Sequence, residues 1–242
     1  MLRQIFKTGN LRLWGEYKKK LRKEHKLSYL FWECTMNCNF YCKHCGSNAG
    51  KKRFDNHISA ELMKKVFKET AENFKSKEIT IAVTGGEPLL RQDLFEIMGY
   101  ASSLGFKWGM VTNGFLVTES VIEKMRNSGM KTIVVSIDGI GDLHDELRGV
   151  KGAYTQAINA IGLLAKEKFI QELQITTVIS KKNIHLLEEM YKEFSKLGID
   201  SWRMINVDPI GRAEINKELL LSGKELKVLL DFIKEKRKNQ KK

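Results

Sequence analysis

The chain has 242 residues, of which 42% are hydrophobic and 29% are charged, a balance that is typical of a folded globular protein and excludes a disordered one. No apolar run reaches the roughly 18 residues that a membrane span needs, and the basic N-terminus lacks the apolar core of a secretory signal, so we expect a cytoplasmic protein without a membrane span. The 42 lysines and arginines outnumber the 29 acidic residues and give a net charge of +13, which would favour nucleic-acid binding if the charge lay on the folded body.

The excess positive charge is concentrated at the two ends of the chain. Residues 1–26 contain nine basic and two acidic side chains, and residues 224–242 contain eight basic and three acidic ones. Because these segments account for +7 and +5 of the total of +13, everything between them has a net charge of +1. We therefore predict a basic helical lead-in over residues 1–26 and basic ends that are solvated or dock a partner, which disfavours nucleic-acid binding by the body.

From residue 27 onward, apolar runs alternate with longer amphipathic segments. Strands are predicted at residues 28–33, 78–84, 107–112, 132–137, 173–179 and 202–207. Helices are predicted at residues 60–74, 93–104, 119–128, 154–168, 184–197 and 224–236, with Asn183 as a cap for the fifth and Ser222 with Glu225 as a capping box for the last. Six strand–helix units imply a parallel sheet with right-handed crossovers in one α/β domain. Periodicity alone leaves an open doubly wound sheet, a barrel and a partial barrel as alternatives.

All four cysteines lie close together, directly after the first predicted strand, at Cys34, Cys38, Cys42 and Cys45. Local clustering in a cytosolic protein indicates a metal site and not a disulfide framework. Structural zinc prefers two short ligand pairs separated by a longer span, whereas iron–sulfur clusters accept compact runs of cysteines. Three ligands spaced Cys38-x₃-Cys42-x₂-Cys45 on a four-iron cluster would leave one iron open for a substrate or cofactor.

The other unusual sequences also follow predicted strands, at the edge where parallel α/β folds bind ligands. They are Thr84-Gly85-Gly86-Glu87-Pro88, Thr112-Asn113-Gly114, Ser136-Ile137-Asp138-Gly139 and Asn206-Val207-Asp208-Pro209. The sequence therefore predicts one site at the carboxyl ends of the strands, shared by these loops and the cysteines.

The Cys-x₃-Cys-x₂-Cys loop after the first strand, followed by Gly-Gly-Glu-Pro after the second, resembles the radical SAM superfamily over about residues 27–212. The resemblance implies a partial (β/α)₆ TIM-like barrel. It also implies a [4Fe-4S] cluster on Cys38, Cys42 and Cys45, with S-adenosylmethionine (SAM) on the fourth iron. Reductive cleavage of SAM would then give a 5′-deoxyadenosyl radical that abstracts hydrogen from a substrate.

The resemblance further assigns the loop Gly85-Gly86-Glu87-Pro88 to the methionine amino group of SAM. Glycines let the backbone approach a ligand closely, and a carboxylate such as that of Glu87 accepts hydrogen bonds from an ammonium. Proline at position 88 stiffens the turn.

Three more positions are assigned by the same resemblance, and Asp138 is added because it is expected to face the cavity. His44 matches the position beside the nucleoside, and Ser136 matches a polar residue that contacts the ribose or the carboxylate. Arg148 resembles the arginine that pairs with the methionine carboxylate, a task suited to a guanidinium. Asp138 is a candidate general base, with a turn-forming aspartate as the alternative. The alternatives are a surface histidine for His44, a strand-end cap for Ser136 and a surface charge for Arg148.

The segments around Ser136-Ile137-Asp138-Gly139, Leu147-Arg148-Gly149 and Pro209-Ile210-Gly211-Arg212-Ala213 resemble the SPASM/twitch branch, which includes sulfatase-maturing enzymes and peptide maturases. This branch acts on side chains of a peptide or protein, with an electron donor such as flavodoxin or ferredoxin. Its members carry cysteine-rich extensions for auxiliary clusters, but no cysteine follows Cys45. We therefore expect residues 27–242 to form a radical SAM core without an auxiliary-cluster domain.

Three other functions stay open at this point. A glycyl-radical enzyme activase shares the cysteine spacing and a compact chain. A non-catalytic metal-binding module would use the basic ends to contact nucleic acid, with zinc in place of iron and binding that weakens steeply with salt. An electron-transfer protein would use Cys34 as a fourth ligand and so prevent SAM from binding the cluster, whereas a packed Cys34 thiol fits the enzyme.

Overall fold

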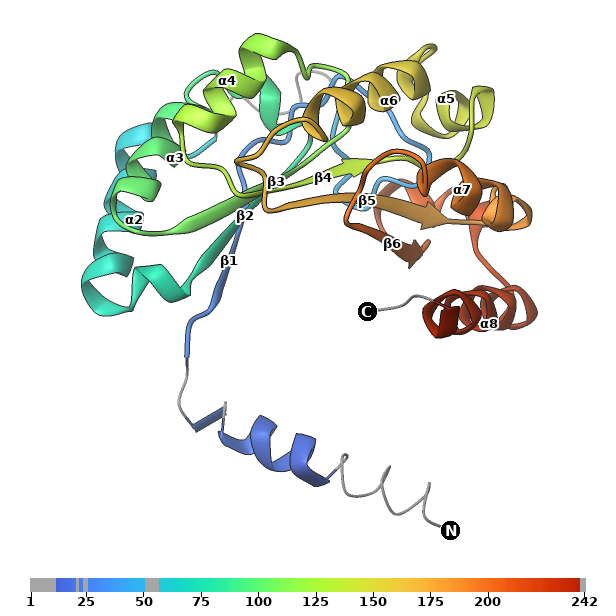
Figure 1. Cartoon of the computed structure of the whole chain (residues 1–242), viewed down its shortest axis with the longest axis horizontal. Helices are drawn as coiled ribbons and strands as arrows, with labels where there is room; N and C mark the ends of the chain where they lie inside the picture. Colours follow the sequence, from blue (N-terminus) through green and yellow to red (C-terminus); the bar gives the residue numbers. More distant parts are fainter. Residues whose placement is uncertain (1–11, 21, 24–25, 51–56, 240–242) are drawn as a thin grey trace.

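The computed structural model describes residues 12–20, 22–23, 26–50 and 57–239. Residues 12–20 and 22–23 are helical and exposed, and they stand apart from the sheet in Figure 1. The rest of the 1–26 segment, apart from residue 26, lies outside the described residues. Among the helices described, none is both long enough and apolar enough to cross a membrane.

Six parallel strands form one sheet, and their order in the sheet is their order in the chain. They are β1 (Tyr29–Glu33), β2 (Thr80–Thr84), β3 (Lys107–Thr112), β4 (Thr132–Ser136), β5 (Glu172–Ile179) and β6 (Ser201–Asn206). A doubly wound sheet would reverse direction at a switch point, which this order excludes. Within the described residues, β1 and β6 each pair on one side only, so the barrel is partial. The predicted α/β class and partial barrel are confirmed.

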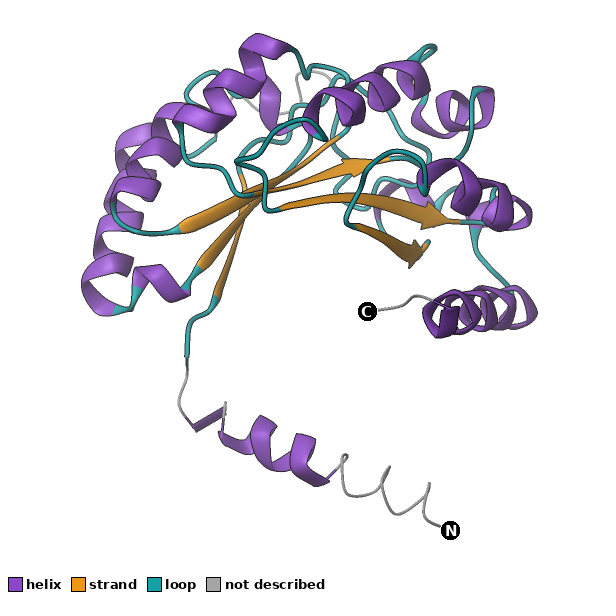
Figure 2. Ribbon diagram, in the orientation of Figure 1, coloured by secondary structure: helices purple, strands orange, loops and turns teal. Residues whose placement is uncertain are grey.

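Helices cover one face of this sheet, as Figures 1 and 2 show. They are α2 (Ala60–Asn73), α3 (Leu94–Ser103), α4 (Glu119–Asn127), α5 (Asp142–Arg148), α6 (Ala153–Leu164), α7 (Leu187–Phe194) and α8 (Gly223–Asn239). Each of the six predicted helices is present within a few residues, and Ser222 with Glu225 forms the expected capping box. The short helix α5 was not predicted.

The hydrophobic core lies between the sheet and its helices. β1 shows how the alternation of a strand divides its side chains, because Trp32 packs edge-to-face on Phe67 of α2 at 6.0 Å whereas Phe31 points to the other face and is 75% exposed. Tyr29 lies on the same face of the sheet as Phe31, which is the inner face without helices, and it is 50% exposed. The concave inner face of the partial barrel is therefore open between β1 and β6, and the carboxyl ends of the strands gather at its rim.

Candidate functional site

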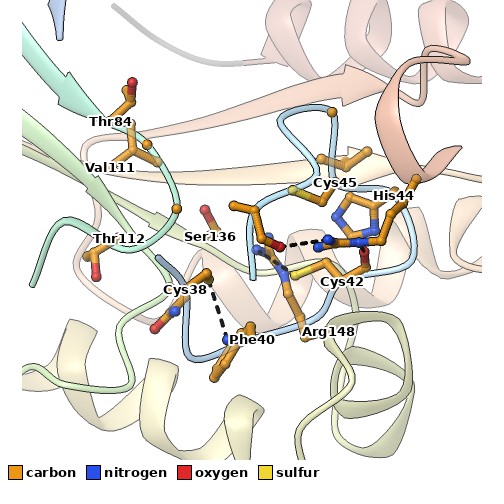
Figure 3. A pocket seen from close by; sticks show the side chains of 17 residues that line it. Cys38, Phe40, Cys42, His44, Cys45, Thr84, Val111, Thr112, Ser136 and Arg148 are labelled. Atoms are coloured by element: carbon orange, nitrogen blue, oxygen red, sulfur yellow. Dashed lines mark hydrogen bonds between the residues drawn. The ribbon is translucent and has the colours of Figure 1, made fainter. Parts of the chain in front are cut away.

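A cavity of about 230 Å³ lies at the carboxyl ends of the strands and is shown in Figure 3. Eight of the predicted site residues line it, namely Cys38, Cys42, His44, Cys45, Gly85, Gly86, Ser136 and Arg148. Glu87, Pro88 and Asp138 were predicted to belong to the same site, but they are buried behind its wall. The cavity thus brings together the cysteine loop and the ends of β2 and β4, as the sequence predicted.

The cysteine loop leaves β1 and closes on itself. The amide of Cys38 donates to the carbonyl of Gly50 at 3.1 Å, and the amide of Gly50 donates to the carbonyl of Met36 at 3.3 Å, so the two ends of the loop are held together. Phe40, at 2% exposure, anchors the middle of the loop edge-to-face against Phe115. The loop therefore carries its thiols on a fixed backbone.

Three thiols of the cysteine loop share the cavity. Within the described part of the chain, no three Cys, His, Asp or Glu side chains converge closely enough to hold one metal ion. Cys38, Cys42 and Cys45 instead surround the cavity, and compact cysteine runs are typical of iron–sulfur ligation. Burial raises the pKa of Cys38 to about 11 and also raises that of Cys42, so both thiols keep their protons at neutral pH and would release them only on binding a metal.

Cys34 lies outside the cavity. Its side chain is 1% exposed and packs in the main hydrophobic core, and burial raises its pKa to about 12. This position agrees with a packed thiol and gives no support to a fourth cluster ligand.

The two glycines after β2 lie directly against the cysteine loop. The amide of Gly86 donates to the carbonyl of Thr35 at 2.7 Å, and Gly85 has a φ of +133°. A Cβ on Gly86 would lie 2.2 Å from the carbonyl oxygen of Asn37, closer than any side chain can tolerate. Glycine is thus required here so that two backbones can meet at the cavity wall.

Replacing Gly86 with alanine is expected to push the cysteine loop away from β2 and to abolish most of the iron uptake. The measurement is iron and sulfide per chain after anaerobic reconstitution. Gly162→Ala is the matched control, because a Cβ at Gly162 on α6 meets nothing within 4 Å. Wild-type iron content in Gly86→Ala would show that the close contact is dispensable.

Glu87 does not hold the position that the resemblance implied. Its buried carboxylate accepts hydrogen bonds from the Thr112 hydroxyl and the Asn113 amide, both at 2.8 Å, and from the Leu89 amide at 3.2 Å. Burial raises the pKa of Glu87, although these donors oppose the shift. The carboxylate therefore fixes the end of β3 to the glycine loop, with Pro88 buried beside it, and only Gly85 and Gly86 of this loop reach the cavity.

Asp138 is the centre of a buried ion-pair network. Its Oδ2 lies 2.6 Å from Arg148 Nε and 3.0 Å from His44 Nε2, and its Oδ1 accepts from the Val178 amide at 2.9 Å. Burial alone would raise the pKa of Asp138, but Arg148 and His44 together hold it well below its usual range. Asp138 has both oxygens engaged and does not line the cavity, which favours a positioning role over that of a general base.

Two residues of this ion-pair network belong to the wall of the cavity. His44 and Arg148 line the cavity with side chains only 7% and 11% exposed, so neither is a surface residue. Arg148 also contacts Cys42, with Nη1 3.8 Å from Sγ. Ser136 ends β4 at the same wall.

Sequence reasoning missed two residues that support this site. Asn183 does not cap α7; its amide group donates to the carbonyls of Asp138 and Val178, both at 2.8 Å. Arg212 lines the cavity after β6 and was noticed only as part of a branch motif. The contact of Asn183 with the loop after β4, 45 residues earlier, has no local signal that could have revealed it.

Comparison with known proteins finds relatives of similar sequence. It is similar to the AdoMet-dependent heme synthase of Nitratidesulfovibrio vulgaris, at 31% identity over 86% of this chain and 55% of that protein. It is also similar to the mycofactocin maturase MftC of Mycolicibacterium smegmatis, at 29% identity over 84% of this chain and 51% of that protein. The chain therefore spans about half the length of these curated relatives.

Solved structures share the fold. SuiB of Streptococcus suis bound to S-adenosylmethionine gives a TM-score of 0.68 at 18% identity, over 95% of this chain and 53% of SuiB. The anSMEcpe structure with bound AdoMet gives 0.72 at 23% identity, over 88% of this chain and 62% of that one. Residues 32–203 match the family model described as "Radical SAM superfamily". The predicted family, and with it the prediction of an enzyme, is confirmed: the chain belongs to the radical SAM superfamily, whose members use a [4Fe-4S] cluster and SAM.

Proposed function

We propose that this chain is a radical SAM enzyme whose Cys38, Cys42 and Cys45 hold a [4Fe-4S] cluster and whose cavity binds SAM beside it. The observation that carries this proposal is that the three thiols, two glycines and a buried arginine line one cavity at the carboxyl ends of the strands. When bound, the cluster and SAM supply reductive cleavage to a 5′-deoxyadenosyl radical, which takes a hydrogen atom from the substrate.

The residues of the chain provide the binding geometry. Arg148 is held through Nε by Asp138, which leaves the rest of its guanidinium to pair with the methionine carboxylate. His44 is fixed by the same carboxylate beside the cavity. Phe40 and Val178 add apolar wall, which excludes water from a reactive radical.

A peptide or protein is the substrate class that we propose first. MftC is named as a maturase. SuiB was solved bound to precursor peptide SuiA, and that structure has a TM-score of 0.66 to this chain. The anSMEcpe enzyme was also solved with a bound peptide. The open inner face of the barrel, with Phe31 and Tyr29 exposed, gives a large substrate a route to the cavity.

A tetrapyrrole is the second candidate, and one that the sequence did not suggest. It is supported by the heme synthase of Nitratidesulfovibrio vulgaris and by an Fe-coproporphyrin III synthase of Methanosarcina barkeri at 33% identity over 66% of this chain. A cytoplasmic location and a flavodoxin or ferredoxin as electron donor complete the proposal. Residues 27–242 would form the radical SAM core, and this chain offers no cysteine after Cys45 to an auxiliary cluster.

The test is product formation by the anaerobically reconstituted chain with SAM and dithionite. We expect 5′-deoxyadenosine and methionine from the wild type and none from Cys42→Ala. Three candidate substrates are then supplied separately: a deuterated peptide that is encoded beside the gene, a deuterated iron porphyrin and a glycyl-radical enzyme. The true substrate transfers deuterium to 5′-deoxyadenosine or, in the case of the glycyl-radical enzyme, acquires the radical. The absence of 5′-deoxyadenosine from a chain that holds the cluster would refute the proposed function.

A further inference from the structure

Two buried arginines line the cavity, but the structure gives only one of them a carboxylate partner. Arg148 is paired with Asp138. Arg212 is 5% exposed and, among the described residues, has no carboxylate within ion-pair distance; its guanidinium donates to uncharged oxygens instead. A buried charge without a counter-ion is costly, so an anionic occupant of the cavity would complete this arrangement.

The acceptors of Arg212 all belong to the cysteine loop. Its Nε donates to the carbonyl of Cys42 at 2.6 Å, and its Nη1 donates to the carbonyl of Ala49 at 2.6 Å and to Oδ1 of Asn48 at 3.2 Å. The guanidinium also lies over the ring of Tyr41, 4.0 Å from its centroid. One side chain thus ties together both arms of a loop that lies more than 160 residues earlier in the chain.

The neighbours of Arg212 in the chain also contact the cysteine loop. The amide of Arg212 donates to the carbonyl of Cys45 at 3.0 Å, and Asn216 Nδ2 donates to the carbonyl of Lys43 at 3.1 Å. Gly211 has a φ of +60°, and a Cβ there would lie 2.3 Å from the carbonyl oxygen of Gly46. Residues 211–216 are therefore packed closely against the cysteine loop.

We propose that Arg212 is a positioning residue that locks the cysteine loop and acts as the fixed counter-charge of the cluster held by Cys38, Cys42 and Cys45. The inference rests on the proposed function and extends it to control of the cluster. A four-iron cluster with three thiolates is anionic and becomes more so on reduction. A fixed positive charge at its edge favours the reduced state, because charge and hydrogen bonding around a cluster tune its potential.

Two variants separate the two roles. Arg212→Lys keeps the charge but loses the planar fork that reaches three acceptors, and Arg212→Gln loses both. Arg91→Gln is the matched control: Arg91 is buried, donates to the carbonyl of Cys34 at 2.8 Å and pairs with Asp93, but it does not line the cavity.

The locking role is tested on the chain without its cluster, by hydrogen–deuterium exchange. We expect exchange over residues 42–50 to become at least about 10-fold faster in both Arg212 variants, since hydrogen bonds from a charged donor are lost, while the strands keep their protection. Unchanged exchange in this segment, or faster exchange throughout the core, would overturn the locking role.

The counter-charge role is tested by redox titration of the reconstituted chain, followed by EPR. The midpoint potential of Arg212→Gln should be more negative than that of the wild type, whereas those of Arg212→Lys and Arg91→Gln should stay near it. Equal potentials in Arg212→Gln and the wild type, or in Arg212→Gln and Arg212→Lys, would overturn this role. A wild-type chain that takes up no four-iron cluster would instead refute the proposed function, and the exchange experiment would still decide the locking role.

Discussion

Alanine at Cys38, Cys42 or Cys45 is expected to abolish the iron–sulfur cluster, and alanine at Cys34 is expected to leave it intact. The first three thiols line the cavity, and in the proposed cluster each would supply one iron with its protein ligand. Cys34 packs in the hydrophobic core instead. Its loss removes one small buried group and costs stability of about 1 kcal/mol without touching a ligand.

The measurement is iron and sulfide per chain together with the visible absorption of the reconstituted proteins. Cys34→Ala serves as the matched control, since it changes the same residue type in the same segment. Loss of iron in Cys34→Ala as well as in the other three variants would identify a closed four-cysteine cluster and favour the electron-transfer alternative. Full iron content in Cys42→Ala would contradict the assigned ligand set.

Asparagine at Asp138 is expected to have the second largest effect. It leaves the buried guanidinium of Arg148 and the imidazole of His44 without their carboxylate, and breaking a buried pair costs about 3 kcal/mol or more. Because folding lowers the pKa of Asp138, the pair stabilises the fold above the ordinary pKa of 3.8 and this contribution is lost only as the pH falls below it. The loss in Asp138→Asn is therefore fully visible in urea unfolding at pH 7.

The same substitution separates a positioning residue from a general base. We expect the KM for SAM to rise by at least about 10-fold, because Arg148 is no longer aimed at the cavity. A general base would instead lower turnover with the affinity for SAM unchanged. Glu146→Gln is the control: its ion pair with Lys43 is about half exposed, and we expect a change in stability below about 1 kcal/mol. Equal stability of Asp138→Asn and the wild type would contradict the network.

The fold could be predicted from sequence because its signals are local. The run that forms β3 is apolar and bounded by Gly105 and by Asn113-Gly114, and its predicted ends at Lys107 and Thr112 match the structure. Helix α5 was missed because seven largely polar residues carry no clear apolar period; what holds it in place is burial of His144, Leu147 and Arg148 by the rest of the molecule.

The lining of the site was predictable as far as it follows the strand ends, and its supporting contacts were not. Cys38, Cys42, Cys45, Gly85 and Gly86 reach the cavity because they lie in loops that follow strands ending there. The carboxylates of Glu87 and Asp138 also follow strands, but each turns away to contact a partner from another part of the chain, Thr112 in one case and His44 in the other. Which way such a side chain turns depends on donors that only the tertiary structure brings near.

The central claim is that SAM binds directly to a cluster held by Cys38, Cys42 and Cys45. The most direct measurement is the EPR spectrum of the reduced, reconstituted chain before and after SAM is added. We expect a four-iron signal whose g values change on addition of SAM, and we expect a weaker change in Asp138→Asn. A four-iron signal that stays the same at saturating SAM, or a chain that binds zinc and no iron, would contradict it.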